Sequence, residues 1–200
     1  MTAVPQPKPP RMTALEFIDW AMRTGFHGEL LDGEPVAMAP ENARHVRTKM
    51  RVGRALEDAV ARAGLSCEAL IDGMAVAVEH GTAFQPDAMV RCGPELPGEA
   101  SRVEDAVIVV EVLSPSSISI DTSRKLLGYF RLPSVRHYLI VDPEKRMVIH
   151  HARDDGAGIA TRLLGQGSLV LDPPGLAVDV ADLFPPAPPP ADPRAMTDAR

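Results

Sequence analysis

The stretch AVIVVEVLSPSS, residues 106–117, decides the fold of this chain. Its first five residues are all apolar and mostly β-branched, and a Ser/Pro turn ends it, which is typical of a strand buried on both faces. Glu111 stands near the C-terminal end of that strand. Because burying an ionised carboxylate is costly unless a cation or hydrogen bonds compensate it, Glu111 indicates a functional site.

Downstream of the turn, Asp121, Lys125 and Tyr129 recur at every fourth position. This spacing predicts one stripe of a helix that packs back on the strand. Upstream, Asp87 follows Pro86 beside a short apolar run. If the two strands are neighbours, the carboxylates of Asp87 and Glu111 meet at one edge of the sheet. Such a pair suits Mg²⁺ or Mn²⁺, with Lys125 assisting the attacking water.

Other interpretations of the same residues stay open at this point. Glu111 could form a structural ion pair with an arginine such as Arg131 or Arg136, and Lys125 by itself could be a solvated helix residue. Asp121 is expected to cap or charge its helix N-terminus. Tyr129 is expected to pack in the core.

The composition bounds the class of protein. With 200 residues, 45% apolar, the chain suffices for one globular domain, expected over residues 12–184. The Pro-rich segments 1–11 and 185–200 are expected to lack fixed structure. No apolar run approaches the roughly 20 residues of a membrane helix. Cys67 and Cys92 have no CxxC spacing and are expected to be free thiols of a cytoplasmic protein.

Local signals predict the N-terminal half. A capping box at Thr13 starts a helix that continues to Gly25, and Asp32-Gly33 joins two strands of a hairpin over residues 29–38. Asn42 and Gly64 bound a long helix. Its expected buried stripe is Val46, Met50, Gly53, Val60 and Ala63.

Five basic side chains and no acidic one lie between Arg44 and Arg54. Arg47 and Arg51 fall opposite the expected apolar stripe. They could form a solvated face or contact the phosphate backbone of a nucleic acid, and the pattern leaves both readings open. His45 and Lys49 flank the stripe and could lean toward the sheet.

Taken in order, several segments resemble the Uma-two family of restriction endonucleases, within the PD-(D/E)XK nuclease superfamily. They are Glu29 to Glu34, Pro40 to His45, Pro86-Asp87, Glu111 to Ser116, Asp121 with Lys125 and Tyr129, and His137 to Pro143. The resemblance covers about residues 29–184. It implies an α/β restriction-endonuclease-like core: a mixed central β-sheet flanked by helices, with an N-terminal helix and β-hairpin.

The resemblance also implies roles for particular residues. Asp87 and Glu111 become ligands of Mg²⁺ or Mn²⁺, Lys125 the catalytic lysine, His45 a substrate contact and Glu29 an additional acid. The superfamily pattern E-x-K would place a lysine two residues after the glutamate, where this chain has Leu113. The resemblance therefore implies that the lysine function has moved to Lys125.

The function expected from the sequence is metal-dependent hydrolysis of duplex DNA by a homodimeric endonuclease. One alternative is a catalytically inactive nucleic-acid-binding or protein-interaction module of the same fold, favoured by Leu113 and by the net charge of −6. A second is a metal-dependent hydrolase of a small phosphorylated compound, which would not need the arginines of residues 44–54.

Overall fold

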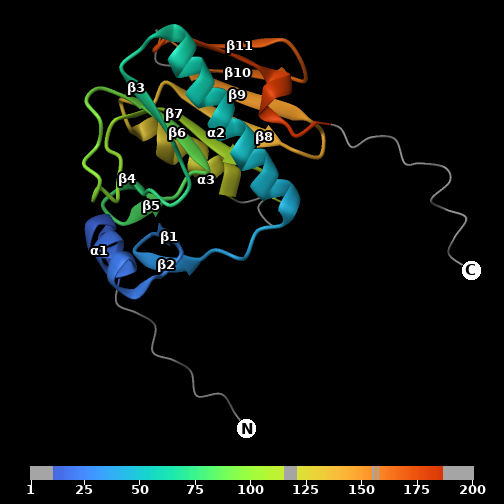
Figure 1. The fold of residues 1–200 in the computed structure, drawn as a ribbon. Coiled ribbons are helices and arrows are strands. Elements are labelled where there is room, and N and C mark those ends of the chain that lie inside the picture. The colour runs from blue at the N-terminus through green and yellow to red at the C-terminus, as the bar shows by residue number, and fades with distance from the viewer. Residues whose placement is uncertain (1–10, 115–120, 155, 157, 187–200) are drawn as a thin grey trace, which may run out of the picture.

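A six-stranded sheet forms the centre of the molecule, and α2 and α3 cover its two faces (Figure 1). The computed structural model describes residues 11–114, 121–154, 156 and 158–186. The helices are α1 (Ala14–Thr24), α2 (Ala43–Ala63), α3 (Asp121–Arg131) and the 3-10 helix η1 (Val180–Leu183). The strands are β1 (Gly28–Leu31), β2 (Glu34–Ala37), β3 (Cys67–Ile71), β4 (Val76–Glu79), β5 (Thr82–Phe84), β6 (Ala88–Cys92), β7 (Ala106–Val112), β8 (His137–Asp142), β9 (Met147–Arg153), β10 (Ile159–Leu164), β11 (Ser168–Leu171) and β12 (Leu176–Asp179).

The large sheet has the strand order β10-β9-β8-β7-β6-β3 and is mixed. β7 and β8 run parallel to each other, and the other neighbours are antiparallel. All six residues of β8 are buried, as expected for a strand covered on both faces. The expected mixed α/β architecture is therefore confirmed, with β7 near its centre.

A second sheet of four strands, in the order β2-β1-β5-β4, forms the lower part of the molecule with α1 (Figure 1). The Thr13 capping box and the Asp32-Gly33 hairpin both form as the sequence predicts. The apolar run around Asp87 is divided between the two sheets. Phe84 ends β5 in the small sheet, and Ala88 begins β6 in the large one. Asp87 therefore lies at the junction of the two sheets.

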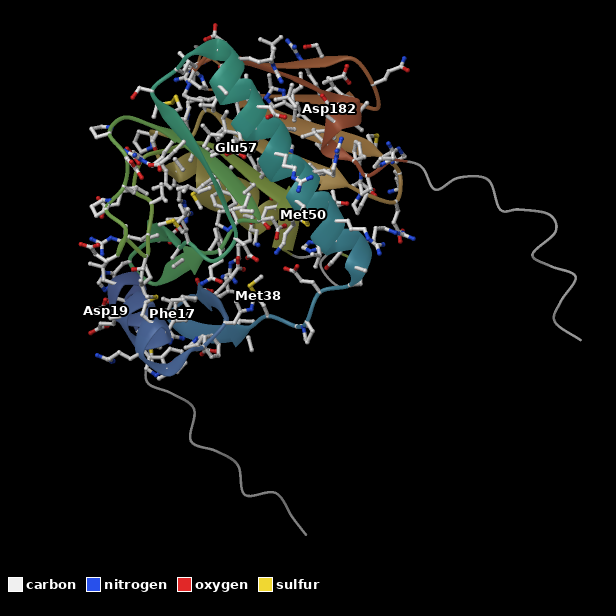
Figure 2. All side chains as sticks on the ribbon, viewed as in Figure 1. Phe17, Asp19, Met38, Met50, Glu57 and Asp182 are labelled. Atoms are coloured by element: carbon white, nitrogen blue, oxygen red, sulfur yellow. A yellow bond between two sulfur atoms is a disulfide. The ribbon has the colours of Figure 1, made fainter. Side chains whose placement is uncertain are left out.

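The long helix α2 begins and ends where the caps predict, because the side chain of Asn42 accepts from the N–H of His45 and Gly64 adopts φ 63°. The predicted buried stripe is partly wrong. Val46 and Met50 are 42% and 46% exposed, whereas His45 and Lys49 are each only 6% exposed. Met50 and Glu57 mark the outer side of this helix in Figure 2. The buried face thus carries two basic side chains toward the sheet.

The expectation of two free thiols is wrong. Cys67 of β3 lies directly opposite Cys92 of β6 in the antiparallel register, with 3.8 Å between their Cα atoms, and a disulfide joins them. This register could not be read from a spacing of 25 residues. The terminal segments expected to lack fixed structure lie, but for residues 11, 185 and 186, outside the described residues. No described helix is long and apolar enough to cross a membrane.

Candidate metal centre and nuclease site

Asp87 is held at the junction of the two sheets by backbone and side-chain contacts. Its Oδ2 accepts from the N–H of Val112 at 2.6 Å and lies 3.5 Å from Nε2 of His45. Its Oδ1 lies 3.5 Å from Nζ of Lys49. The carboxylate is 5% exposed. It is therefore a buried acid with both a hydrogen bond and cationic neighbours, as burial of a charge requires.

Glu111 is held by the helix on the opposite face of the sheet. Its Oε1 accepts from Oη of Tyr129 at 2.6 Å and from Nζ of Lys125 at 3.0 Å. The same Nζ lies 2.9 Å from Oε1 of Glu29, an atom that also accepts from the N–H of Gln85. Lys125 thus bridges two carboxylates, one from β7 and one from the N-terminal hairpin.

The two acids lie at the same end of the sheet. Ala88 pairs with Val110 in the antiparallel register, so Asp87 stands across from Glu111 at the next position. The two carboxylates nevertheless contact different helices, Asp87 with α2 and Glu111 with α3. Asp87 contacts the strand of Glu111 through the backbone N–H of Val112. After burial, the charge of Asp87 is a further cause of the raised pKa of Glu111.

The pKa of Glu111 is raised to about 8. Burial is the main cause, and the charges of Asp87 and Glu29 add to it, while Lys125 and the Tyr129 hydroxyl oppose it. Burial opposes protonation of His45, but its hydrogen bond to Asp87 and the charge of that acid raise its pKa to about 9. Both groups therefore hold a proton near neutral pH, Glu111 mainly because it is buried and His45 because of the adjacent carboxylate.

Sequence reasoning gave Lys49 no role, and it missed Glu41 and Asp72 altogether. Lys49 Nζ donates to Glu41 Oε1 at 2.6 Å and to Asp72 Oδ2 at 3.1 Å. Burial tends to lower the pKa of Lys49, but these bonds and the nearby charge of Asp87 raise it overall. Glu41 also places Oε2 3.2 Å from Nδ1 of His45. The only sequence signal for this group was the pair of basic residues flanking the stripe of α2.

The donor set fits a hard divalent cation. One ligand atom each from Glu41, His45 and Asp87 lie within 4.8 Å of one another. Of the two predicted metal ligands, Asp87 belongs to this group and Glu111 does not. Carboxylate oxygens are the ligands that Mg²⁺ and Mn²⁺ prefer, and a cation beside Asp87 would offset the negative charge of that acid, which adds to both pKa shifts.

The structure decides between the alternatives for several residues. Lys125 is 7% exposed and pairs with Glu111, so it is not a solvated helix residue. Arg131, the proposed structural partner of Glu111, forms its ion pair with Glu79 instead. Tyr129 packs in the core, fully buried, and its hydroxyl also reaches Glu111. The side chain of Asp121 lies outside the described residues.

The arginines of α2 lie apart from this centre. Arg47 is exposed, and it follows His45 by two positions, which is about 200° around a helix. Arg51 is half-buried, and its Nε has no hydrogen-bond partner among the described residues. The fold brings the guanidinium of neither Arg47 nor Arg51 to Asp87 or Glu111. These arginines would therefore contact a substrate away from the bond that is cleaved.

The comparisons with known proteins agree with this architecture. The sequence profile of the Uma2 family, described as "Putative restriction endonuclease", matches residues 14–183. Two uncharacterized proteins of Synechocystis sp. are each 26% identical to this chain: slr1290 over 86% of this chain and 91% of its own, and sll1609 over 78% and 90%. The fold is similar to that of a crystal structure from Anabaena variabilis titled a "putative nuclease belonging to DUF820", with a TM-score of 0.66 at 15% identity, covering 86% of this chain and 97% of that one. The chain therefore belongs to the Uma2 family of restriction-endonuclease-like proteins.

Proposed function

We propose that this protein is a metal-dependent endonuclease that hydrolyses phosphodiester bonds of DNA. The observation that carries the proposal is the position of Lys125, whose Nζ lies 3.0 Å from Glu111 and 2.9 Å from Glu29. Leu113 occupies the place of the usual lysine, and α3 supplies an ammonium group to the glutamate in its stead. This geometry supports an active nuclease over an inactive module.

In the proposed mechanism Asp87 and Glu111 would hold Mg²⁺ or Mn²⁺, with His45 and Glu41 beside Asp87. When bound, the metal lowers the pKa of a water molecule and stabilises the negative charge that builds on the phosphate. The backbone N–H of Val112 orients the Asp87 carboxylate, and the Tyr129 hydroxyl orients that of Glu111. Lys125 orients the attacking water and favours its deprotonation, and Glu29 positions Lys125.

The deciding experiment is nicking of supercoiled plasmid by the full chain with Mg²⁺, Mn²⁺ or a chelator. We expect metal-dependent nicking by the wild type, and its loss in Asp87→Asn and in Glu111→Gln. Glu57→Gln is the matched control, because Glu57 is exposed on the outer side of α2 (Figure 2). Salt-sensitive DNA binding without nicking would favour the inactive module, and nicking that survives both substitutions would refute the assigned site.

Duplex binding through Arg47 and Arg51 is part of the proposal. Both belong to α2, the helix that also delivers His45 to Asp87, so a duplex seated at the site would pass along this helix. Replacing both by glutamate should weaken DNA binding at low salt and reduce the slope of log K against log salt by about 2. Unchanged DNA binding would show that these arginines are solvated and do not contact the phosphate backbone.

A homodimer would match the two-fold symmetry of duplex DNA. The support is the position of β2, which is an outer strand of the four-stranded sheet and carries Pro35. Analytical ultracentrifugation of the full chain tests this part of the proposal. A monomer at micromolar concentration with and without DNA would contradict it.

A further inference from the structure

A cavity of about 380 Å³ opens beside the candidate metal centre. Three segments line it: residues 42–45 in the first turn of α2, residues 113–114 after β7, and residues 142–145 in the turn between β8 and β9. Its volume falls in the range of pockets that hold small organic groups. Asp87, Glu111 and Lys125 do not line this cavity, so their proposed roles do not account for it.

The cavity shares one wall residue, His45, with the proposed catalytic site. This side chain lines the cavity, and its Nε2 lies 2.8 Å from the carbonyl oxygen of Val112 and 3.5 Å from Asp87. Leu113, on another wall, is only two residues beyond Glu111. His45 and Leu113 therefore place the cavity on the Asp87 side of the proposed catalytic site.

Each charged side chain that lines the cavity has a partner of opposite sign, and the partners of His45 are Glu41 and Asp87. Arg44 donates to Glu144 at 2.8 Å, and Lys145 lies 3.4 Å from Asp142. A phosphate group would meet two carboxylates together with the two cations, so this arrangement does not favour an anion. The cavity suits a group that is neutral overall.

The rest of the lining suits a flat group with polar edges. Ala43, Leu113 and Pro143 supply apolar surface. Asn42 uses its Oδ1 to cap α2, and the same amide carries an NH₂ that can donate. Arg44 adds a planar guanidinium, a group on which nucleobases stack.

We propose that this cavity receives one unpaired nucleobase of the strand that is cut. The inference rests on the proposed nuclease function and specifies its substrate as DNA with an unpaired nucleotide beside the scissile phosphate. A base within a duplex has both faces covered by its neighbours, so only an unpaired or extruded base can enter such a pocket. The cavity thus selects DNA by its local structure.

The test compares two fluorescent DNA hairpins that differ at a single position. One carries an unpaired thymidine in a bulge, and the other carries an abasic residue there. Binding to the full chain is measured by anisotropy at low salt with a chelator, so that no strand is cut. Ala43→Phe narrows the cavity from an exposed helix position, and Ala61→Phe places the same ring elsewhere on the exposed side of α2.

We expect the wild type and Ala61→Phe to bind the thymidine bulge about tenfold more tightly than the abasic one, and Ala43→Phe to bind both equally. Equal binding of the two hairpins by the wild type overturns the inference, whether or not the variants fold. A preference that persists in Ala43→Phe overturns it as well. A preference for the thymidine bulge without metal-dependent cleavage would support the nucleobase pocket and refute the proposed nuclease activity. Metal-dependent cleavage without that preference would support the nuclease activity and refute the pocket.

Discussion

The Nζ atom of Lys125 lies 3.0 Å from Oε1 of Glu111, although no lysine stands two positions after the glutamate. The lysine of the following helix thus places an ammonium group beside the glutamate, where a lysine on the strand would otherwise place one. The difference is that the helix lysine also meets Glu29, 2.9 Å away. The proposed catalytic lysine is consequently fixed by two acids from separate segments of the chain.

Replacing Lys125 by methionine should abolish metal-dependent plasmid nicking, lowering the rate by about 10²-fold or more. The substitution removes the group proposed to orient the water. It also removes the nearest cation from Glu111, whose pKa is already about 8, so that this carboxyl should stay protonated at neutral pH. Nicking rates at pH 7 and 9 measure the effect. A variant that cuts at the wild-type rate would refute the role of Lys125.

Lys49→Met should lower the free energy of unfolding by about 3 kcal/mol, because it removes the buried ammonium group that lies beside Glu41 and Asp87. Arg54→Met, an exposed basic position on the same helix, should change it by less than about 0.5 kcal/mol. Urea unfolding measures both. If a divalent metal binds beside Asp87, Mn²⁺ should raise the melting temperature of Lys49→Met more than that of the wild type. Equal shifts would place the metal elsewhere.

Burial of His150 should make a contribution to stability that falls between pH 7 and pH 5. Nδ1 of His137 lies 2.9 Å from Nε2 of His150, and both rings are 4% exposed. Burial, together with the charges of His137, Arg162 and His151, lowers the pKa of His150 from 6.5 to about 4. Below pH 6.5 this ring therefore binds a proton in the unfolded chain but not in the folded chain, and its contribution to the free energy of unfolding decreases as the pH falls.

The His150 contribution to this loss should be about 2 kcal/mol between pH 7 and pH 5. Urea unfolding of His150→Gln at the two pH values measures it, since the variant should lose less stability on acidification than the wild type. His80→Gln, at an exposed position, is the control and should keep the wild-type pH dependence. An unchanged slope in His150→Gln would show that this ring does not titrate differently on folding.

Gly128→Ala should destabilise the protein, although alanine favours helices by about 1 kcal/mol over glycine. A Cβ at this position would lie 2.6 Å from Cε2 of Phe84, a ring that is fully buried. Overpacking of this kind costs about 1–3 kcal/mol. It should also displace α3 and reduce nicking, because Lys125 lies one turn earlier. Ser123→Ala, exposed on the same helix, should leave both unchanged, and a stabilised Gly128→Ala would contradict the close packing.

Local signals sufficed to predict most elements, because caps and turns act over a few residues. Asn42 and Gly64 bounded α2 correctly, yet the face that α2 buries was misassigned. Choosing the most apolar stripe placed Val46 and Met50 inside, whereas the acids at the sheet junction draw His45 and Lys49 inward. The partners that decide this lie on other segments, and no periodicity within the helix reveals them.

The candidate site was predictable where its members follow one another along the chain. Glu111 ends a strand, and the next helix returns over that strand, so Lys125 and Tyr129 could be placed beside it from spacing. Glu41 and Asp72 lie outside the helices and strands and have no pattern of their own. Their meeting at Lys49 depends on tertiary packing that joins positions 41, 49 and 72.

The hairpin that carries Glu29 limits how far this chain can be trimmed. A shortened protein that starts after Met38 would keep the large sheet and both proposed metal ligands. It would lose one of the two acids that fix Lys125, together with the neighbour strand of β5 that adjoins the Gln85–Asp87 corner. A fragment able to test catalysis must therefore begin before Gly28, where β1 starts.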